Sequence, residues 1–403
     1  MNNKKINTFL SRIFSYTDYA RRRSAPYTAT HYNLDTMRAM LTCLKNPERQ
    51  FRSIHIAGTK GKGSTAHYIA YLLQQSGYKT GLYTSPQIRD ERDRMRINGR
   101  IISWRYMETL FSKIEKIALR EKLKPTVFEF FTVMAFCWFK EKKVDYAVIE
   151  TGLGGRLDST NTIQPEISVI TPIDYDHMDK LGHTLREIAG EKAGIIKPNT
   201  PVITSNTRTL PVKILKKTAR INSSYFFQSG EMPPNVFNPD MPAFLQQNAA
   251  LAAKTLEFLD IEINPEHLKN LPEIPGRYHL RGNILLDGAH NPFAFFALIQ
   301  AVRNDPRFTN LQKHMLFFAL PDKDIRGMLG ILPRDWKLTF INLRVPYIAN
   351  LADWKKFRST YRPDAGIISN RKEIKKLVSG EGAVYIVTGS FLLVNYFLKN
   401  RLM

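Results

Sequence analysis

Cysteine is scarce in this chain of 403 residues, which contains only Cys43 and Cys137. The two cysteines are far apart and form no Cys-x-x-Cys pair, so the sequence predicts neither a disulfide framework nor a thiolate zinc site. A reducing compartment suits such a chain, and we expect a cytoplasmic protein.

Long apolar runs are also lacking. No stretch approaches the roughly 18 residues of a membrane span, and the first residues lack the apolar segment of a secretory signal. Internal repeats and low-complexity tracts are absent too. With 43% hydrophobic and 24% charged residues, the composition is that of a globular protein long enough for two domains, which argues against disorder.

Acidic residues are outnumbered, because 36 Asp and Glu stand against 59 Lys and Arg and leave a net charge of +23. This excess favours an acidic partner, which could be a nucleotide, a polyanionic small molecule, nucleic acid or an anionic membrane surface. Charge alone does not choose among these partners. Since the basic clusters are short, such as Lys142 with Lys143, a solvated basic surface is the simplest interpretation.

The most informative motif runs from Ile54 to Thr65 and reads IHIAGTKGKGST. An apolar run that predicts a strand opens into glycines around a lysine, and a helical pattern follows. Glycines let backbone N–H groups turn toward phosphates, the helix presents its positive N-terminal end, and the lysine adds a charge. We therefore expect a nucleoside triphosphate to be bound by Gly58, Thr59, Gly61, Lys62, Gly63, Ser64 and Thr65.

The spacing of this motif differs from the general phosphate-binding loop. Such a loop has four residues between its glycines and a Ser or Thr directly after the lysine, where the hydroxyl binds Mg²⁺. Here Gly63 follows Lys62, so the first hydroxyl comes one position late, at Ser64. We expect a metal ligand to come from elsewhere.

Polar side chains at the ends of other predicted strands are the candidates, because ligands of α/β sheets lie beyond the carboxyl ends of the strands. Val144–Glu150 is an apolar strand that ends in a carboxylate, which is how nucleoside triphosphatases hold Mg²⁺. His177 follows a second strand together with two aspartates, and Ser85 follows a third. A solvent-facing glutamate and a structural histidine are the alternatives at these positions.

Strand-like runs alternate with helical patterns, which predicts mostly parallel sheets covered by helices. The first series covers 53–57, 81–84, 144–150, 167–171 and 201–204. The turn-rich segment 270–277 interrupts it, and a second series follows at 284–287, 314–320, 338–343 and 383–388. We place a domain boundary there, with one domain at 1–272 and another at 273–403.

The turn Gly152–Gly155 does not fit a dinucleotide-binding fingerprint, which disfavours nicotinamide chemistry.

Taken together, the motifs resemble those of the folylpolyglutamate synthase and dihydrofolate synthase family, within the wider group of Mur-type amide ligases. The resemblance runs in order from about residue 31 to the last strand. The segments that carry it are GTKGKGST (58–65), YTSP (83–86), RING (96–99), FE (128–129), ETGLGGRLDSTN (150–161), EKAGIIKP (191–198), PGR (275–277), DGAHNP (287–292) and ALPDKD (319–324).

The resemblance implies an α/β fold, with a Mur-ligase-like ATP-binding domain and a smaller Rossmann-like C-terminal glutamate-ligase domain. It implies an enzyme that uses ATP and Mg²⁺ to join L-glutamate to a pterin carboxylate through an acyl phosphate. The small-molecule partners would be dihydropteroate or a reduced folate, and L-glutamate. We expect a monomer that binds neither nucleic acid nor a membrane.

Carried over by position, the family pattern also implies roles for single residues. Mg²⁺ would be held by Ser85, Glu150, His177 and Lys192, the last as a carbamate. The nucleotide would be met by Asn248 at the adenine and, from the second domain, by Arg277, Asp287 and His290. Catalytic roles fall to Lys62, His177, Lys192 and Arg277. The pteroate would contact Thr126, Val127, Phe128, Glu129, Leu157, Asp158 and Ser159.

Four positions depart from the family pattern. Lys60 stands where the family usually has Asn, Gln87 where it has His, and Phe244 and Leu245 where it has a His-Gln pair. We interpret these as altered tuning near the nucleotide and the substrate.

Two other functions remain open from the sequence. One is a Mur-type ligase that acts on a cell-wall precursor, and the other is a basic P-loop ATPase that binds nucleic acid. The first disagrees with the segments at 150–161 and 287–292, and the second lacks a recognisable nucleic-acid module. The sequence does not tell whether the first glutamate, later glutamates or both are added.

Overall fold

The computed structural model describes residues 1–17, 33–343 and 351–402. Residue 31, where the family resemblance begins, lies outside these ranges. The chain divides into two compact units, one made of Met1–Asn238 with Leu245–Leu271 and the other of Pro239–Phe244 with Pro272–Met403.

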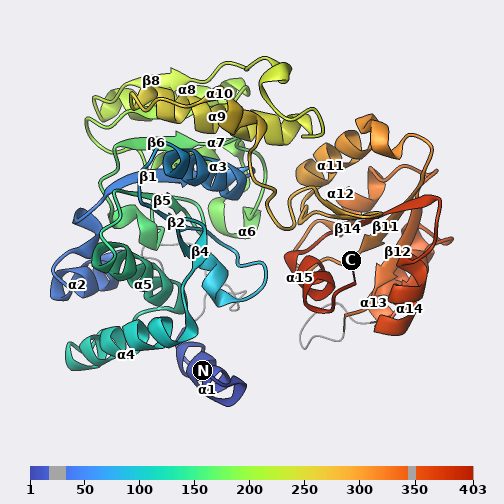
Figure 1. Ribbon diagram of the computed structural model, residues 1–403, viewed down its shortest axis with the longest axis horizontal. Coiled ribbons are helices and arrows are strands. Elements are labelled where there is room, and N and C mark those ends of the chain that lie inside the picture. Colours follow the sequence, from blue (N-terminus) through green and yellow to red (C-terminus); the bar gives the residue numbers. More distant parts are fainter. Residues whose placement is uncertain (18–32, 344–350, 403) are drawn as a thin grey trace. The chain divides into compact units, whose positions relative to one another are not determined.

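The first unit is built on a sheet with the strand order β4-β3-β2-β5-β1-β6-β7-β8 (Figure 1). In that order the strands span Arg100–Ile101, Met95–Ile97, Thr80–Tyr83, Tyr146–Glu150, Arg52–Ala57, Ile167–Ile170, Val202–Thr204 and Phe226–Gln228. All neighbours from β2 to β8 pair in parallel, and β3 and β4 form an antiparallel edge. The carboxyl ends of β2, β5, β1 and β6 therefore lie at one edge of the sheet.

Helices cover both faces of this sheet. They are α1 (Asn3–Ile13), α2 (Asp35–Cys43), α3 (Lys62–Gln75), α4 (Trp104–Arg120), α5 (Val127–Glu141), α6 (Met178–Leu181), α7 (Leu185–Ala193), α8 (Thr209–Ile221), α9 (Ala243–Phe258) and α10 (Pro265–Lys269). On one face, α1, α2, α4 and α5 share an apolar core with β5. On the other side of the sheet, α3 packs on β1, β2 and β5 (Figure 1).

The second unit has its own sheet, with the strand order β13-β12-β11-β14-β10-β9. The strands span Gly366–Ile368, Lys337–Ile341, Gln312–Phe317, Ala383–Thr388, Ile284–Leu286 and His279–Arg281. Only the β9–β10 pair is antiparallel among these described strands. The helices are α11 (Pro292–Asn304), α12 (Ile325–Gly330), α13 (Leu351–Tyr361), α14 (Arg371–Val378) and α15 (Phe391–Lys399).

The α/β class with mostly parallel sheets, predicted from the sequence, is confirmed. The prediction missed β3, β4, β8, β9 and β13, each of only two or three residues, because such short strands depend on their partners more than on local pattern. Residues 239–244 belong to the second unit, although the expected boundary placed them in the first. The reason is that Asp240 bonds to Arg307 and Phe244 packs on Tyr278.

No helix within the described ranges is both long enough and apolar enough to cross a membrane.

Helix α5 offers a stability test, because Phe130 is fully buried and its ring lies 5.0 Å from that of Phe111 and 4.7 Å from that of Tyr16. Phe130→Ala should lower the free energy of unfolding by about 3–5 kcal/mol, since it leaves a cavity among rings that cannot close over it. Leu119→Ala on α4 is the control, because Leu119 is 67% exposed. We expect this variant to change the free energy of unfolding by no more than about 0.5 kcal/mol. Denaturant unfolding followed by circular dichroism measures both, and equal losses would contradict this description of the core.

Candidate functional site

The predicted site residues of the first unit gather at the carboxyl edge of its sheet. Gly58 follows β1, Glu150 ends β5, and His177 lies in the loop after β6. The register places Ile56 beside Glu150 and Ala57 beside Ile170, so these three strands end side by side. Ser85 follows β2, the neighbour of β5.

The glycine-rich loop joins β1 to α3 in a shape that glycine allows. Gly61 caps the helix with a φ of +79°, and Gly58 has a φ of +150°. A Cβ atom on Gly61 would lie 2.1 Å from Oδ1 of Asn248, so this side chain packs directly on the loop. Because Gly61 has no side chain, the first-turn amides of α3 are open to an anion at the positive end of the helix.

The loop after β6 holds the glycine-rich loop in place. The backbone N–H groups of Thr59 and Lys60 donate to the carbonyl of Pro172 at 3.0 and 3.3 Å. The Thr59 hydroxyl accepts from the N–H of Asp174 and donates to its carbonyl, both at 3.0 Å. Sequence reasoning missed Pro172 and Asp174 as supporting residues, because more than a hundred residues separate them from Thr59; the adjacency of β1 and β6 was the only available clue.

Two lysines converge on one backbone carbonyl in this site. The amine of Lys62 donates to the carbonyl oxygen of Gly58 at 3.2 Å, and the amine of Lys192 on α7 donates to the same oxygen at 2.8 Å. Burial, followed by repulsion from Lys62, lowers the pKa of Lys192 to about 7. The lowered pKa favours the uncharged form of this amine, which is the nucleophilic form.

Glu150 and Ser85 lie together. Glu150 is buried, and its Oε2 accepts a hydrogen bond of 3.0 Å from the backbone N–H of Ser85. His177 begins α6 in the left-handed region, with a φ of +48°, and its side chain is 39% exposed. Its Nε2 lies 3.9 Å from Oδ1 of Asp176, a carboxylate that also acts electrostatically on Lys192. Asp176 is one of the two aspartates that the sequence places beside His177.

The donor set suits a cation that prefers oxygen ligands. Among the residues that the structure describes, no three His, Cys, Asp or Glu side chains form a metal-binding group. Mg²⁺ needs no such cage, because it keeps several waters and binds one or two carboxylates together with substrate phosphates. Glu150 supplies a buried carboxylate, and the hydroxyls of Thr65 and Thr151 are buried without a hydrogen-bond partner in the described part of the chain. Carboxylate and hydroxyl oxygens are the kind of ligand that Mg²⁺ prefers.

The two segments expected to bind the pteroate lie against each other. Thr126 and Glu129 form a capping box at the start of α5, and Val127 is buried in its first turn. A Cβ on Gly152 would lie 2.5 Å from the ring of Phe128, so this ring covers the turn after Glu150. Burial raises the pKa of Glu129, whose carboxylate accepts from the Thr126 N–H at 2.7 Å.

Asp158, flanked by the half-buried Leu157 and Ser159, uses its carboxylate on the protein itself. Its Oδ2 accepts from the N–H groups of Gly152 and Leu153 at 2.9 and 2.8 Å. Its Oδ1 accepts from the N–H of Thr160 at 3.0 Å and from the Thr160 hydroxyl at 2.5 Å. The side chain is buried, and its observed role is to hold the turn that follows Glu150.

In the second unit, two of the three predicted nucleotide residues lie around the ring of Phe391, and the third, Asp287, binds backbone N–H groups. The guanidinium of Arg277 is 4.4 Å from the ring centroid, and the His290 ring is 6.2 Å from it. Asp287 accepts from the N–H groups of Tyr278 and Ala289, both at 2.8 Å, and is buried. Phe391 was not among the predicted residues.

The departures from the family pattern at 244 and 245 match apolar surroundings. Phe244 packs edge-to-face on Tyr278, with the ring centroids 6.2 Å apart, and Leu245 is buried. The Lys60 amine is buried, and the Gln87 amide oxygen is buried without a hydrogen-bond partner in the described ranges. The contacts do not explain why these two residues replace those of the family.

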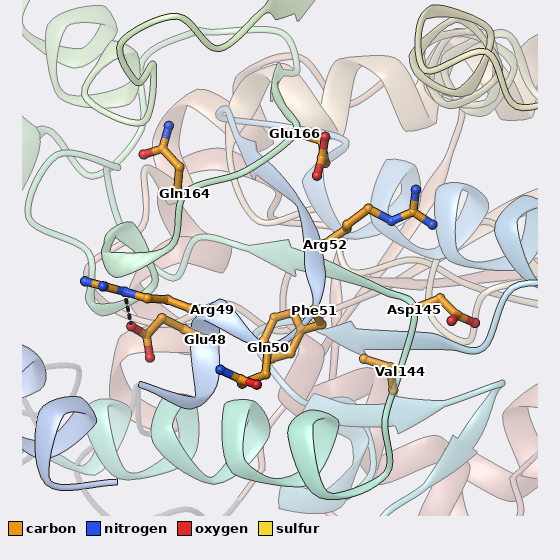
Figure 2. Close-up of a pocket in the computed structure, with 9 residues that line it drawn as sticks. All are labelled: Glu48, Arg49, Gln50, Phe51, Arg52, Val144, Asp145, Gln164 and Glu166. Carbon is orange, nitrogen blue, oxygen red and sulfur yellow. Dashed lines mark ion pairs between the residues drawn. The ribbon is translucent and has the colours of Figure 1, made fainter. Parts of the chain in front are cut away.

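A cavity of about 580 Å³ lies at the opposite edge of the first sheet, where β1 and β5 begin (Figure 2). Its lining comprises Glu48, Arg49, Gln50, Phe51, Arg52, Val144, Asp145, Gln164 and Glu166. No predicted site residue is among them, so this cavity is separate from the candidate site.

Comparison with known proteins identifies the family. A model of the Mur ligase middle domain matches residues 56–231. A dihydrofolate synthase/folylpolyglutamate synthase from Bacillus subtilis is 36% identical, over 91% of this chain and 94% of that protein. The chain belongs to the dihydrofolate synthase/folylpolyglutamate synthase family. The family predicted from the sequence is thereby confirmed.

Solved structures of this family share the fold. The crystal structure of folylpolyglutamate synthase from Thermotoga maritima has a TM-score of 0.84 and 27% identity, and the match covers 99% of this chain and 97% of that one. The Mycobacterium tuberculosis folylpolyglutamate synthase complexed with ADP and AMPPCP has a TM-score of 0.82 and 25% identity, with 92% and 95% covered.

Gly61→Ala tests the close packing of the loop on Asn248. We expect nucleotide affinity to fall at least about tenfold, because the added methyl group has to displace the Asn248 side chain from the loop. Gly77→Ala is the matched control, since Gly77 also has a positive φ, +89°, but faces open space. Both variants should lose about 1–2 kcal/mol of unfolding free energy from backbone strain. Calorimetry with an ATP analogue and Mg²⁺ measures the affinity, and equal affinities in the two variants would contradict the packing.

Proposed function

We propose that this protein is an ATP-dependent ligase that adds L-glutamate to dihydropteroate, to tetrahydrofolate or its polyglutamates, or to both acceptors. The observation that carries the proposal is the convergence of Lys62 and Lys192 on the Gly58 carbonyl, beside the open start of α3. We further propose that the enzyme acts as a monomer in the cytoplasm and does not act on nucleic acid.

The nucleotide site is proposed from the same residues. The amides of Gly61 to Ser64 would meet the phosphates, Lys62 would neutralise part of their charge, and Asn248 would meet the adenine. Mg²⁺ would be held by Glu150, Ser85, His177 and the modified Lys192, and its contribution is charge neutralisation. From the second unit we assign Arg277, Asp287 and His290 to the nucleotide. The binding of ADP and AMPPCP by the Mycobacterium tuberculosis relative supports a nucleotide ligand.

The reaction must first activate a carboxylate, because a carboxylate and an amine do not form an amide spontaneously in water. A carboxylate oxygen of the pterin substrate attacks the γ-phosphorus of ATP, and the bond to ADP breaks. The amine of glutamate then attacks the carbonyl carbon of the acyl phosphate, phosphate leaves with the former carboxylate oxygen, and the nitrogen loses a proton. Phosphoryl transfer depends mainly on positioning and charge neutralisation, which Lys62 would supply.

The acceptor would lie against the two packed segments near Phe128, with Thr126, Val127, Glu129, Leu157, Asp158 and Ser159 around it. The carboxylate oxygens of Asp158 and Glu129 accept hydrogen bonds from backbone N–H groups. We therefore propose that these two residues shape the acceptor site rather than pair with charges on the acceptor.

Lys192 is proposed to react with carbon dioxide. The uncharged lysine amine adds to the carbon of carbon dioxide, and the nitrogen then loses a proton to give the carbamate anion. The pKa of about 7 favours that uncharged form. The carbamate replaces a positive charge with a negative one, which removes the repulsion with Lys62.

Lys192→Ala should therefore reduce ligation at least about a hundredfold, with partial recovery when small carboxylates such as acetate are added. Lys217→Ala on α8 is the control and should keep full activity. Initial rates with and without acetate give the result. Full activity of Lys192→Ala would refute the carbamate, and so would a loss that no carboxylate restores.

The function itself is tested by phosphate release from ATP in the presence of Mg²⁺ and L-glutamate, with dihydropteroate or tetrahydrofolate as acceptor. We expect release that depends on an acceptor and is absent in Lys62→Ala. Release with both acceptors would indicate a bifunctional synthase, and release with one would identify its step. The proposal would be overturned if folded protein that binds ATP released no phosphate with either acceptor.

A further inference from the structure

The turn that carries Arg277 contains a tyrosine in an unfavourable backbone conformation. Tyr278 has a φ of +47°, and Gly276, two residues earlier, has a φ of +70°. A left-handed conformation is strained for a bulky residue and persists only where its surroundings hold it. Contacts around Tyr278 must therefore fix this turn.

Three groups hold Tyr278 in the second unit. Its backbone N–H donates to Oδ2 of Asp287 at 2.8 Å. Its hydroxyl donates to Oδ2 of Asp305 at 2.9 Å, and its ring packs on Phe244. The residue is buried, so backbone, ring and hydroxyl are all fixed at once.

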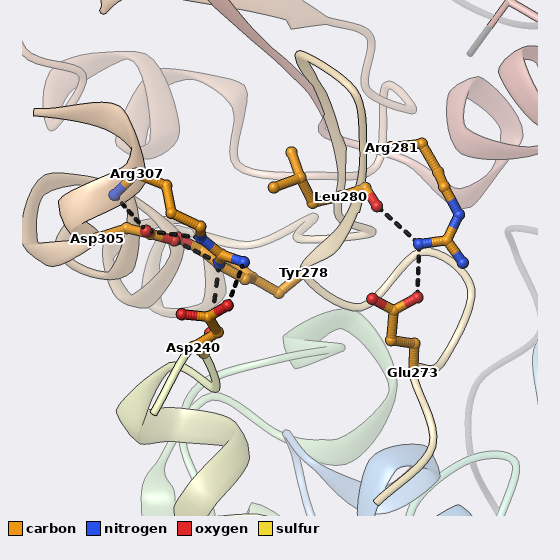
Figure 3. Close-up of polar contacts among 7 residues, drawn as sticks. All are labelled: Asp240, Glu273, Tyr278, Leu280, Arg281, Asp305 and Arg307. Atoms are coloured by element: carbon orange, nitrogen blue, oxygen red, sulfur yellow. Dashed lines mark hydrogen bonds and ion pairs between the residues drawn. The ribbon is translucent and has the colours of Figure 1, made fainter. Parts of the chain in front are cut away.

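Asp305 is in turn fixed by Arg307 (Figure 3). The guanidinium donates to both carboxylate oxygens of Asp305, with Nε at 2.9 Å and Nη2 at 2.7 Å. The same guanidinium reaches Oδ2 and the backbone oxygen of Asp240, each at 3.3 Å. Asp240 and Phe244 both belong to the segment 239–244, so this segment supplies the ring contact and one end of the polar chain.

The charges along this chain support a stable hydrogen bond at the tyrosine. Burial works against ionisation of Asp305, but the hydrogen bonds from Arg307 hold its pKa below the usual value. Burial, with the neighbouring Asp305 charge, raises the pKa of the Tyr278 hydroxyl. The tyrosine therefore remains the donor and the aspartate the acceptor at neutral pH.

We propose that Tyr278 is a positioning residue for Arg277, with Asp305 and Arg307 as its support. The backbone of Tyr278 is the end of the turn, and the guanidinium of Arg277 lies over Phe391 only while that turn keeps its conformation. The inference rests on the proposed function, because the assignment of Arg277 to the nucleotide is part of it.

Tyr278→Phe tests this inference, because it removes the hydroxyl and keeps the ring on Phe244. We expect nucleotide affinity and the ligation rate to fall between about tenfold and a hundredfold, since a small displacement of a charge-bearing group is enough for such a loss. Tyr385→Phe, which removes the hydroxyl of another buried tyrosine of the same unit, is the control and should leave nucleotide affinity unchanged.

A double-mutant cycle separates positioning from general stability. In an Arg277→Ala background, Tyr278→Phe should change the affinity for an ATP analogue with Mg²⁺ by less than about twofold, since the group it positions is gone. The same loss in both backgrounds would overturn the proposal, and so would an Arg277→Ala variant that binds the analogue as the parent does. Asp305→Asn repeats the cycle from the acceptor side.

The affinity cycle needs no acceptor substrate. A protein that binds the analogue but ligates neither pterin would end the proposed function, and the cycle would still decide whether Tyr278 positions Arg277.

Discussion

Two lysine amines share one backbone carbonyl, and the chemistry of the first unit depends on that contact. Lys62 comes from the start of α3 and Lys192 from the end of α7, and both donate to Gly58. Burial and repulsion from Lys62 both work against a charged Lys192. The repulsion between the two amines falls when an anion binds beside them or when Lys192 loses its charge. A triphosphate would supply the first remedy, and the carbamylation that we propose for Lys192 would supply the second.

The parallel sheet makes this contact possible. With β1 between β5 and β6, three loops leave the sheet at neighbouring points, and each brings a different kind of group. The loop after β1 contributes backbone amides and Lys62, and the end of β5 contributes Glu150. The loop after β6 holds the first loop in place through two hydrogen bonds between Asp174 and Thr59. A shift of one residue in the β1–β6 register would turn these side chains to the opposite face and break the grip.

The sequence predicted the parts of the molecule that local pattern controls. Long apolar runs such as those of β5 and β11 identify buried strands, and Lys62 with its glycines identifies a phosphate loop. It did not predict contacts between distant segments, such as the ring of Phe128 against Gly152 or the chain from Asp240 to Tyr278. Residue type also did not reveal how Asp158 and Asp287 use their oxygens. A carboxylate can accept hydrogen bonds from a ligand or from the protein's own backbone. Only the fold shows that backbone N–H groups are the donors to these two carboxylates.

We propose that the acceptor carboxylate is activated as an acyl phosphate. The most direct test is to follow the transfer of oxygen from this carboxylate to phosphate. The acceptor carboxylate is labelled with oxygen-18, and the phosphate released during ligation is analysed by mass spectrometry. We expect one labelled oxygen in each phosphate, because the carboxylate oxygen leaves with the phosphoryl group. Unlabelled phosphate, released while the amide forms, would show that the carboxylate never attacked ATP and would contradict the mechanism.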